Sequence, residues 1–210
     1  MERLEVLDTK VAAIRDLTAE FEQKKYTALL KEPMVSSGRV RVRGSAIRWD
    51  TVKPRRSVIR IDEQEVHIYY PEDASLEIYT VDAQLRRLTA SPLPRLAPMR
   101  EQFDIQPMPA TEIEGAVDGP SMLAIRLKPK EEALRKHVQE VRVLIDTETG
   151  LTMRLEIVDP DGDRTLIVFL KSRTNTGLEE RDLELRVPPE TKVSRPMEGL
   201  QPPTGGDHGK

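Results

Sequence analysis

The stretch Gly38–Asp50, with the sequence GRVRVRGSAIRWD, is the clearest indication of the fold. Arginine and valine alternate through its first half, and the only tryptophan of the chain, Trp49, follows. Alternation with a period of two is typical of a β-strand that has one polar and one apolar face. The arginines belong either to a basic strand that binds nucleic acid or to the outward face of a sheet whose other face is apolar.

The overall charge argues against nucleic acid as the main partner. The 210 residues include 33 Lys and Arg against 36 Asp and Glu, which gives a formal net charge of -3. Proteins that bind nucleic acids usually carry a net basic balance. We therefore expect the arginines to face water, with their stems lying over neighbouring residues, and the valines to face the interior.

Cysteine content and hydropathy exclude further classes. The chain has no cysteine, which excludes disulfides, thiolate metal sites and cysteine nucleophiles. No run of about 18 apolar residues is present, so no segment is expected to span a membrane. The first residues also lack the apolar core of a signal peptide, so we expect a cytoplasmic protein or one whose signal peptide has been removed.

Outward from the opening stretch, the sequence predicts one helix followed by many strands. Apolar residues at spacings of three and four form the stripe of an N-terminal helix, at Leu4, Leu7, Val11, Ile14, Leu17 and Phe21. Alternating segments separated by turn signals predict antiparallel strands over residues 39–43, 57–61, 65–70, 122–127, 141–145, 152–158, 165–172 and 183–187. A helical pattern over residues 82–102 is broken into short pieces by Pro92, Pro94 and Pro98.

These elements predict a mainly β (α+β) fold. We expect a strongly curved, incompletely closed antiparallel β-barrel, or half-barrel, covered by the N-terminal helix and a short helical lid insertion. Aromatic residues make up only 4% of the chain, which favours a concave face that large rings do not fill. A single domain is expected over residues 1–195, followed by a disordered tail over residues 196–210 that is rich in proline and glycine.

The sequence contains no recognisable catalytic or metal-binding motif. His67, on a predicted strand, has no second histidine or carboxylate at ligand spacing. The turn that contains Asp159, Asp161 and Asp163 imitates the start of a calcium loop, but strand residues stand where the later ligands would follow. Motifs for a nucleophile or a phosphate-binding loop are also missing. We expect no enzymatic activity, no metal and no cofactor.

A succession of short motifs covers most of the chain. In order, they are Phe21-Glu22-Gln23-Lys24; Gly38 followed by Ile47-Arg48-Trp49 and Pro54; Asp62, Val66, Tyr69 and Pro71; and a strand with Pro-Pro over Leu183–Pro189. In this order and spacing the chain resembles the periplasmic outer-membrane lipoprotein carrier (LolA-like) family. It departs from the family pattern at Glu63, where the family prefers glycine, and at His67, where it prefers tryptophan.

The resemblance implies a carrier that binds the acyl chains of lipoproteins in an apolar cavity. It implies a periplasmic monomer that moves lipoproteins from the inner to the outer membrane. An inner-membrane ABC-type exporter would load the carrier, and an outer-membrane lipoprotein receptor would unload it. The resemblance also implies a latch in which Arg43 contacts a lid that carries Leu85 and Leu88. Strict alternation, however, points Arg43 away from the cavity unless a bulge turns it inward.

Alternation and strand order predict the apolar lining of the cavity. The predicted lipid-binding residues are Val40, Val42, Ile47, Trp49, Ile59, Ile61, Ile68, Leu76, Ile78, Leu123, Ile125 and Leu127.

Four other functions remain open. A receptor of similar fold would carry an N-terminal lipidated cysteine, and a lipoprotein-sensing regulator would need a second domain. The cavity could instead serve a small hydrophobic ligand or substrate, and polar groups with perturbed pKa values inside it would favour an enzyme. A completely filled interior would indicate a structural or interaction module.

Overall fold

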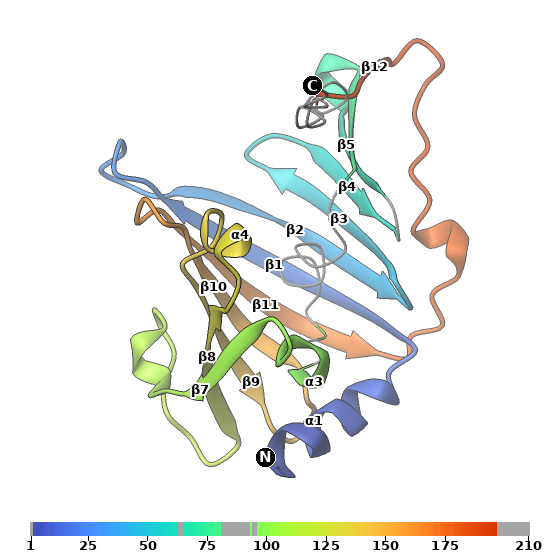
Figure 1. Ribbon diagram of the computed structural model, residues 1–210. Coiled ribbons are helices and arrows are strands. Elements are labelled where there is room, and N and C mark those ends of the chain that lie inside the picture. The colour runs from blue at the N-terminus through green and yellow to red at the C-terminus, as the bar shows by residue number, and fades with distance from the viewer. Residues whose placement is uncertain (1, 63–64, 81–92, 94–95, 197–210) are drawn as a thin grey trace, which may run out of the picture.

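The computed structural model describes residues 2–62, 65–80, 93 and 96–196 (Figure 1). Its main element is one sheet, with strands β1 (Asp16–Tyr26), β2 (Met34–Arg43), β3 (Ala46–Lys53), β4 (Ser57–Ile61), β5 (Glu65–Tyr70), β6 (Ser75–Thr80), β7 (Phe103–Pro107), β8 (Met122–Pro129), β9 (Glu140–Asp146), β10 (Thr152–Val158), β11 (Arg164–Thr174) and β12 (Lys192–Ser194). The helices are α1 (Glu2–Ala12), α3 (Leu96–Met99) and α4 (Glu132–Arg135), with 3-10 turns η1 (Pro71–Asp73), η2 (Ala110–Glu112) and η3 (Glu180–Asp182).

The sheet is open and strongly curved. Its strand order is β12-β6-β5-β4-β3-β2-β1-β11-β10-β9-β8-β7, so among the described residues β12 and β7 are edges that do not meet. Neighbouring strands are antiparallel except β12 and β6, which run parallel. The strands bend around one side of the sheet, where the helices lie (Figure 1). This confirms the predicted half-barrel.

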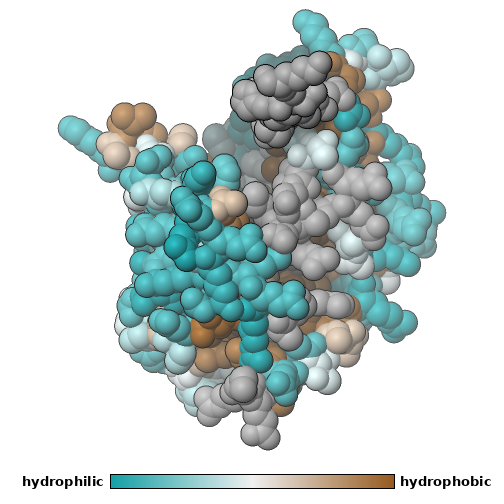
Figure 2. Space-filling model, in the orientation of Figure 1, coloured by the Kyte–Doolittle hydropathy of each residue, from teal (hydrophilic) through white to brown (hydrophobic). Residues whose placement is uncertain are grey.

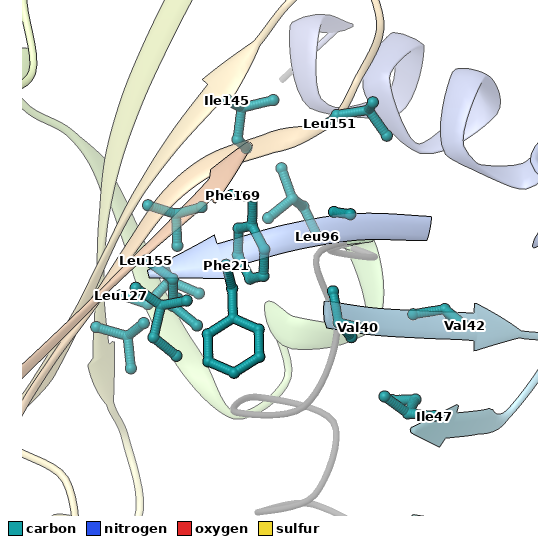
Figure 3. Packing of buried hydrophobic residues seen from close by; sticks show 14 of the residues in the cluster. Phe21, Val40, Val42, Ile47, Leu96, Leu127, Ile145, Leu151, Leu155 and Phe169 are labelled. Carbon is teal, nitrogen blue, oxygen red and sulfur yellow. The ribbon is translucent and has the colours of Figure 1, made fainter. Parts of the chain in front are cut away.

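The two faces of the sheet carry different side chains. We call the side of Val40 and Val42 the inner face, and the side of Arg41 and Arg43 the outer face. Both valines are buried, and they belong to the main hydrophobic core together with residues of α1, α3 and the α4 region. Figure 3 shows side chains of β1, β2 and β11 converging with Leu96 of α3 in this core. The helices therefore cover the inner face.

The outer face has two covers of its own. Residues 108–118, which include η2, pack Ala110 and Ile113 against Leu144 and Leu166. Residues 175–196, which we call the C-terminal strap, run along the other half of the sheet and end in β12 beside β6 (Figure 1).

The N-terminal helix is shorter than the sequence predicts. It ends at Ala12, and β1 begins at Asp16, so Leu17 and Phe21 lie on a strand. Leu17, Ala19 and Phe21 repeat every two residues and are buried on the inner face, because β1 pairs with β2 on one side and β11 on the other. The separation of four residues between Leu17 and Phe21 fits a helix, but it is also a multiple of the strand period of two.

The strand predicted over residues 183–187 is an extended strap and not part of the sheet. Its alternating Leu183, Leu185 and Val187 pack on the outer face, and Leu183 is fully buried. Arginine side chains hold its backbone: Arg41 Nη1 donates to the Asp182 carbonyl at 3.1 Å, and Arg48 Nη1 donates to the Glu184 carbonyl. A segment that lies flat on a sheet shows the same alternation as a strand within it.

Candidate functional site

The floor of the inner face is built around three aromatic rings. Phe21 of β1 and Trp49 of β3 meet edge to face, with ring centroids 4.7 Å apart and an interplanar angle of 71°. Trp49 also lies 5.9 Å from Phe169 of β11. Edge-to-face pairs of this kind add stability beyond the area they bury. The rings fix the central strands relative to one another.

Gly38 allows β2 and β3 to approach closely beside this floor. A Cβ atom at Gly38 would lie 2.0 Å from the backbone oxygen of Asp50, which no side chain can tolerate. The register of β2 against β3 shifts between Ser37 and Gly38. Glycine is required here by the close approach of two backbones.

Helix α1 covers the end of the inner face nearest β1. Leu7 and Val11 are buried there, and the Asp8 carboxylate accepts a hydrogen bond from the Leu96 backbone nitrogen at 2.7 Å. This contact ties α1 to α3, whose Leu96 is fully buried in the core. The described helices therefore seal one part of the concave side.

The inner face is less completely covered over β4 and β5. Ile59 and Val66 pack at the margin of the core and remain only half-buried. Ile68 lies directly opposite Ile59 in the ladder and is also half-buried. Figure 2 shows that hydrophilic residues predominate on the face turned toward the viewer, with smaller groups of hydrophobic residues between them. An apolar surface that keeps partial access is the kind of site that binds hydrocarbon.

Most of the predicted lining residues lie on the inner face. They are Val40, Val42, Ile47, Trp49, Ile59, Ile61, Ile68, Leu123, Ile125 and Leu127. Contact of these residues with lipid remains a prediction.

Leu76 and Ile78 lie on the outer face, contrary to the prediction. They form a separate cluster with Tyr69, and the strap residues Leu185 and Val187 pack against them. The sequence pattern shows which residues of β6 share a face, but not which face is inner. Here the strap provides an apolar cover on the outer side.

Arg43 does not face the concave side either. Its Nη1 donates to the carbonyl of Leu178 in the strap, so the side chain points outward as strict alternation requires. The predicted partners Leu85 and Leu88 lie outside the described residues. Arg39 and Arg41 share this outer face, as predicted, but Arg41 is half-buried and bonded to the strap instead of fully solvated.

A polar cluster at the β6 end of the inner face was not predicted. Ile68 pairs with Glu77 and Val66 pairs with Tyr79, so both polar side chains share the inner face. The Tyr79 hydroxyl donates to Glu77 Oε2 at 2.8 Å, and this hydrogen bond, with burial, raises the pKa of Tyr79. Burial and the nearby Glu77 charge raise the pKa of Tyr70. The signal in the sequence was the alternation Leu76-Glu77-Ile78-Tyr79, interpreted with the wrong face inward.

A separate hollow of about 1030 Å³ lies between the strap and the ends of β1–β4. Its lining includes Arg43, Arg60, Glu180 and Leu183, and carries both charge signs. Asp16, also in the lining, accepts hydrogen bonds from Thr176 N at 2.6 Å and Gly177 N at 3.0 Å. This hollow is on the opposite side of the sheet from the apolar surface.

A network of ion pairs on the outer face, centred on the buried Glu156, holds residues 108–118 in place. Glu156 is fully buried and accepts from Arg142 Nη1 at 2.9 Å and from Arg164 Nη1 at 2.7 Å. Glu114 accepts from the Tyr26 hydroxyl at 2.6 Å and pairs with Lys24 at 3.2 Å. Every charge in this group has an opposite partner, which is the condition for burying charges without a large cost.

The part of the chain that the structure describes contains neither a candidate metal site nor a candidate membrane-spanning helix. No group of three or more His, Cys, Asp or Glu could hold a metal ion there. No helix there is both long enough and apolar enough to cross a membrane.

The open sheet, its apolar inner face and its helical covers define a half-barrel protein with an apolar concave side. The chain belongs to the family described as outer membrane lipoprotein carrier protein LolA, whose family model matches residues 12–182. This is a family of binding and transport proteins and not of enzymes.

A curated relative agrees with this membership, and two solved structures share the fold. An outer-membrane lipoprotein carrier protein from Azotobacter vinelandii is 27% identical over 182 residues, which cover 84% of this chain and 80% of that protein. An uncharacterized conserved protein from Thermus thermophilus has a similar fold, with a TM-score of 0.57, 16% identity, and coverage of 92% of this chain and 97% of that one. MucB gives a TM-score of 0.50 at 15% identity, over 88% of this chain and 62% of that one.

Proposed function

We propose that this protein is a periplasmic carrier that moves lipoproteins from the inner to the outer membrane. The observation that carries the proposal is the half-buried apolar surface of Ile59, Val66 and Ile68 on the concave side of a LolA-family half-barrel. Acyl chains would lie on this surface and extend toward the aromatic floor around Trp49. Aliphatic contacts have no directional requirement, so they suit chains of different length.

The thermodynamics of extraction favours partners at both membranes. Burying one CH₂ is worth about 0.8 kcal/mol, so an anchor of roughly 30–40 methylenes leaves a bilayer at a gross cost above about 20 kcal/mol. A passive carrier does not supply this free energy. We infer that an ATP-driven inner-membrane exporter loads the protein and that an outer-membrane receptor accepts the lipoprotein from it.

The protein acts in this proposal as a monomer with a single carrier domain over residues 1–195. In this proposal one chain binds one set of acyl chains on its own inner face. The tail expected over residues 196–210 lies outside the described residues from residue 197 onward.

Competitive binding tests the proposal. The protein is loaded with a fluorescent hydrocarbon probe and titrated with a triacylated peptide, the same peptide without acyl chains, and a free fatty acid. Displacement at micromolar concentration by the triacylated peptide alone is expected. Stronger displacement by the fatty acid would instead favour a binder of small hydrophobic ligands, and failure of the probe to bind would show that the interior is filled.

A further inference from the structure

The polar cluster of Glu77, Tyr79 and Tyr70 lies beside the proposed acyl-chain surface. Glu77 faces Ile68 across the β5–β6 ladder, and Tyr79 faces Val66. All four of these paired residues are half-buried. The apolar surface therefore ends in a carboxylate and two phenol groups.

Glu77 has unused capacity to accept hydrogen bonds. An ionised carboxylate offers about four lone-pair positions, and Tyr79 is its one hydrogen-bonding partner within the described residues. No lysine or arginine forms an ion pair with it in that part of the chain. Because Glu77 is only half-buried, its remaining lone pairs can accept hydrogen bonds from water or from a ligand.

Tyr70 has unused capacity to donate. Its hydroxyl has no hydrogen-bond partner among the residues that the structure describes. Burial, followed by the charge of Glu77, raises its pKa, so the hydroxyl keeps its proton. One acceptor and one donor thus lie close together at the end of an apolar surface.

We propose that Glu77, Tyr70 and Tyr79 form a subsite for the polar junction at which acyl chains are linked to a lipoprotein. This inference rests on the proposed carrier function and names the part of the cargo that the protein recognises. The junction carries amide N–H groups and ester carbonyls. The Glu77 carboxylate accepts from an amide N–H, the Tyr70 hydroxyl donates to a carbonyl, and Tyr79 holds Glu77 in position.

The same subsite discriminates against free fatty acids. A fatty acid of equal chain length would place its own carboxylate beside Glu77, where like charges repel. A hydrocarbon without polar groups would leave Glu77 desolvated and without a new donor. Only a lipid with a neutral, N–H-bearing junction satisfies both the apolar surface and the carboxylate.

The test uses the full chain, the hydrocarbon probe and three competitors. They are a triacylated peptide, the same peptide with its acylated amide nitrogen methylated, and a fatty acid. Glu77→Leu removes the acceptor, Glu77→Gln keeps an acceptor without charge, and Glu72→Leu is the matched control on an exposed glutamate nearby. Thermal melts establish that each variant is folded.

The expected result is a specific loss. Glu77→Leu weakens binding of the triacylated peptide by about ten- to hundredfold, the range for a hydrogen bond to a charged group, and leaves probe binding unchanged. Methylation weakens binding to the wild type and has no further effect in Glu77→Leu. Glu77→Gln loses less peptide affinity than Glu77→Leu, because a neutral acceptor remains, and it gains affinity for the fatty acid.

Two outcomes overturn the inference and differ from each other. If the wild type binds the triacylated peptide and Glu77→Leu binds it equally well, the subsite is wrong while the carrier function stands. If the wild type binds the probe but not the triacylated peptide, the carrier function fails and the subsite fails with it. An equal effect of methylation in both proteins also contradicts the subsite.

Discussion

The ring of Phe21 stands edge-on to Trp49 across β2, at a centroid distance of 4.7 Å. The two residues belong to strands that are not neighbours in the sheet, because β2 lies between β1 and β3. Their contact therefore reports the curvature of the sheet, which brings side chains of next-but-one strands together on the concave side.

Replacing Trp49 tests how far this contact stabilises the half-barrel. Trp49→Ala should lower the free energy of unfolding by about 3–5 kcal/mol, the usual cost of removing a large buried ring. Urea unfolding followed by circular dichroism measures the change. Trp49→Phe keeps a ring against Phe21 and should cost much less, and an equal loss in both variants would contradict the packing role.

Gly38→Ala should be strongly destabilising. Its Cβ would meet the Asp50 carbonyl oxygen at 2.0 Å, so β2 and β3 would have to separate. A loss of about 3 kcal/mol or more is expected from a clash between two backbones, above the ordinary range for point mutations. Gly119→Ala is the control, since its Cβ would meet only a flexible methionine at 3.6 Å. Similar melting temperatures for the two variants would refute the argument.

Acid should loosen the start of the C-terminal strap through Asp16. Burial opposes ionisation of Asp16, but hydrogen bonds from Thr176, Gly177 and Leu178 outweigh it and lower its pKa below the ordinary value of an aspartate. Because the folded pKa is the lower one, the stabilisation is complete above the unfolded pKa of about 3.9 and is lost as the pH falls through the folded value.

Asp16→Asn measures this contribution. The variant should lose about 1–3 kcal/mol at neutral pH, and its stability should depend less on pH below about 4 than that of the wild type. Chemical unfolding at a series of pH values provides the comparison, with Glu190→Gln as a control on an exposed carboxylate. Parallel pH curves for Asp16→Asn and the wild type would disprove the linkage.

Opposite faces of β5 and β6 should respond differently to a new charge. Ile68→Asp places a carboxylate at the open end of the inner face and should weaken acylated-peptide binding by about tenfold or more, with little change in melting. Leu76→Asp buries a carboxylate beneath the strap and should unfold the protein at a lower temperature. Probe displacement and thermal melts distinguish the two, and the reverse pattern would exchange the assigned faces.

Period-two alternation was enough to predict the half-barrel and the inward side of β2, β3, β4 and β8. It worked where one face is apolar and the other charged, as in the Arg-Val run of β2. It failed for β6, where Leu76 and Ile78 are buried on the side that would ordinarily be solvated, because the strap covers them. No local pattern contains that information, since the strap is separated from β6 by about half of the chain.

The other differences have similar causes. β7 and β12 are short edge strands with little alternation, so no local pattern predicts them. The polar subsite at Glu77 depends on which face of β6 is inward, so the error about Leu76 and Ile78 concealed it. Arg43 was assigned to a lid through resemblance, and the alternation of its own strand predicted its outward direction correctly.

The position of β1 in the middle of the sheet has a consequence for how the chain folds. Its neighbours are β2, the next strand along the chain, and β11, which begins at Arg164. The hairpin with β2 can form as soon as residue 43 is available, whereas the second ladder must close a loop of well over a hundred residues, and such long-range pairing is slow. Before β11 pairs with β1, one edge of β1 is unprotected, and its apolar side chains Leu17 and Phe21 remain exposed. The complete concave surface therefore requires β11, and a chain truncated before β11 should aggregate instead of binding lipid.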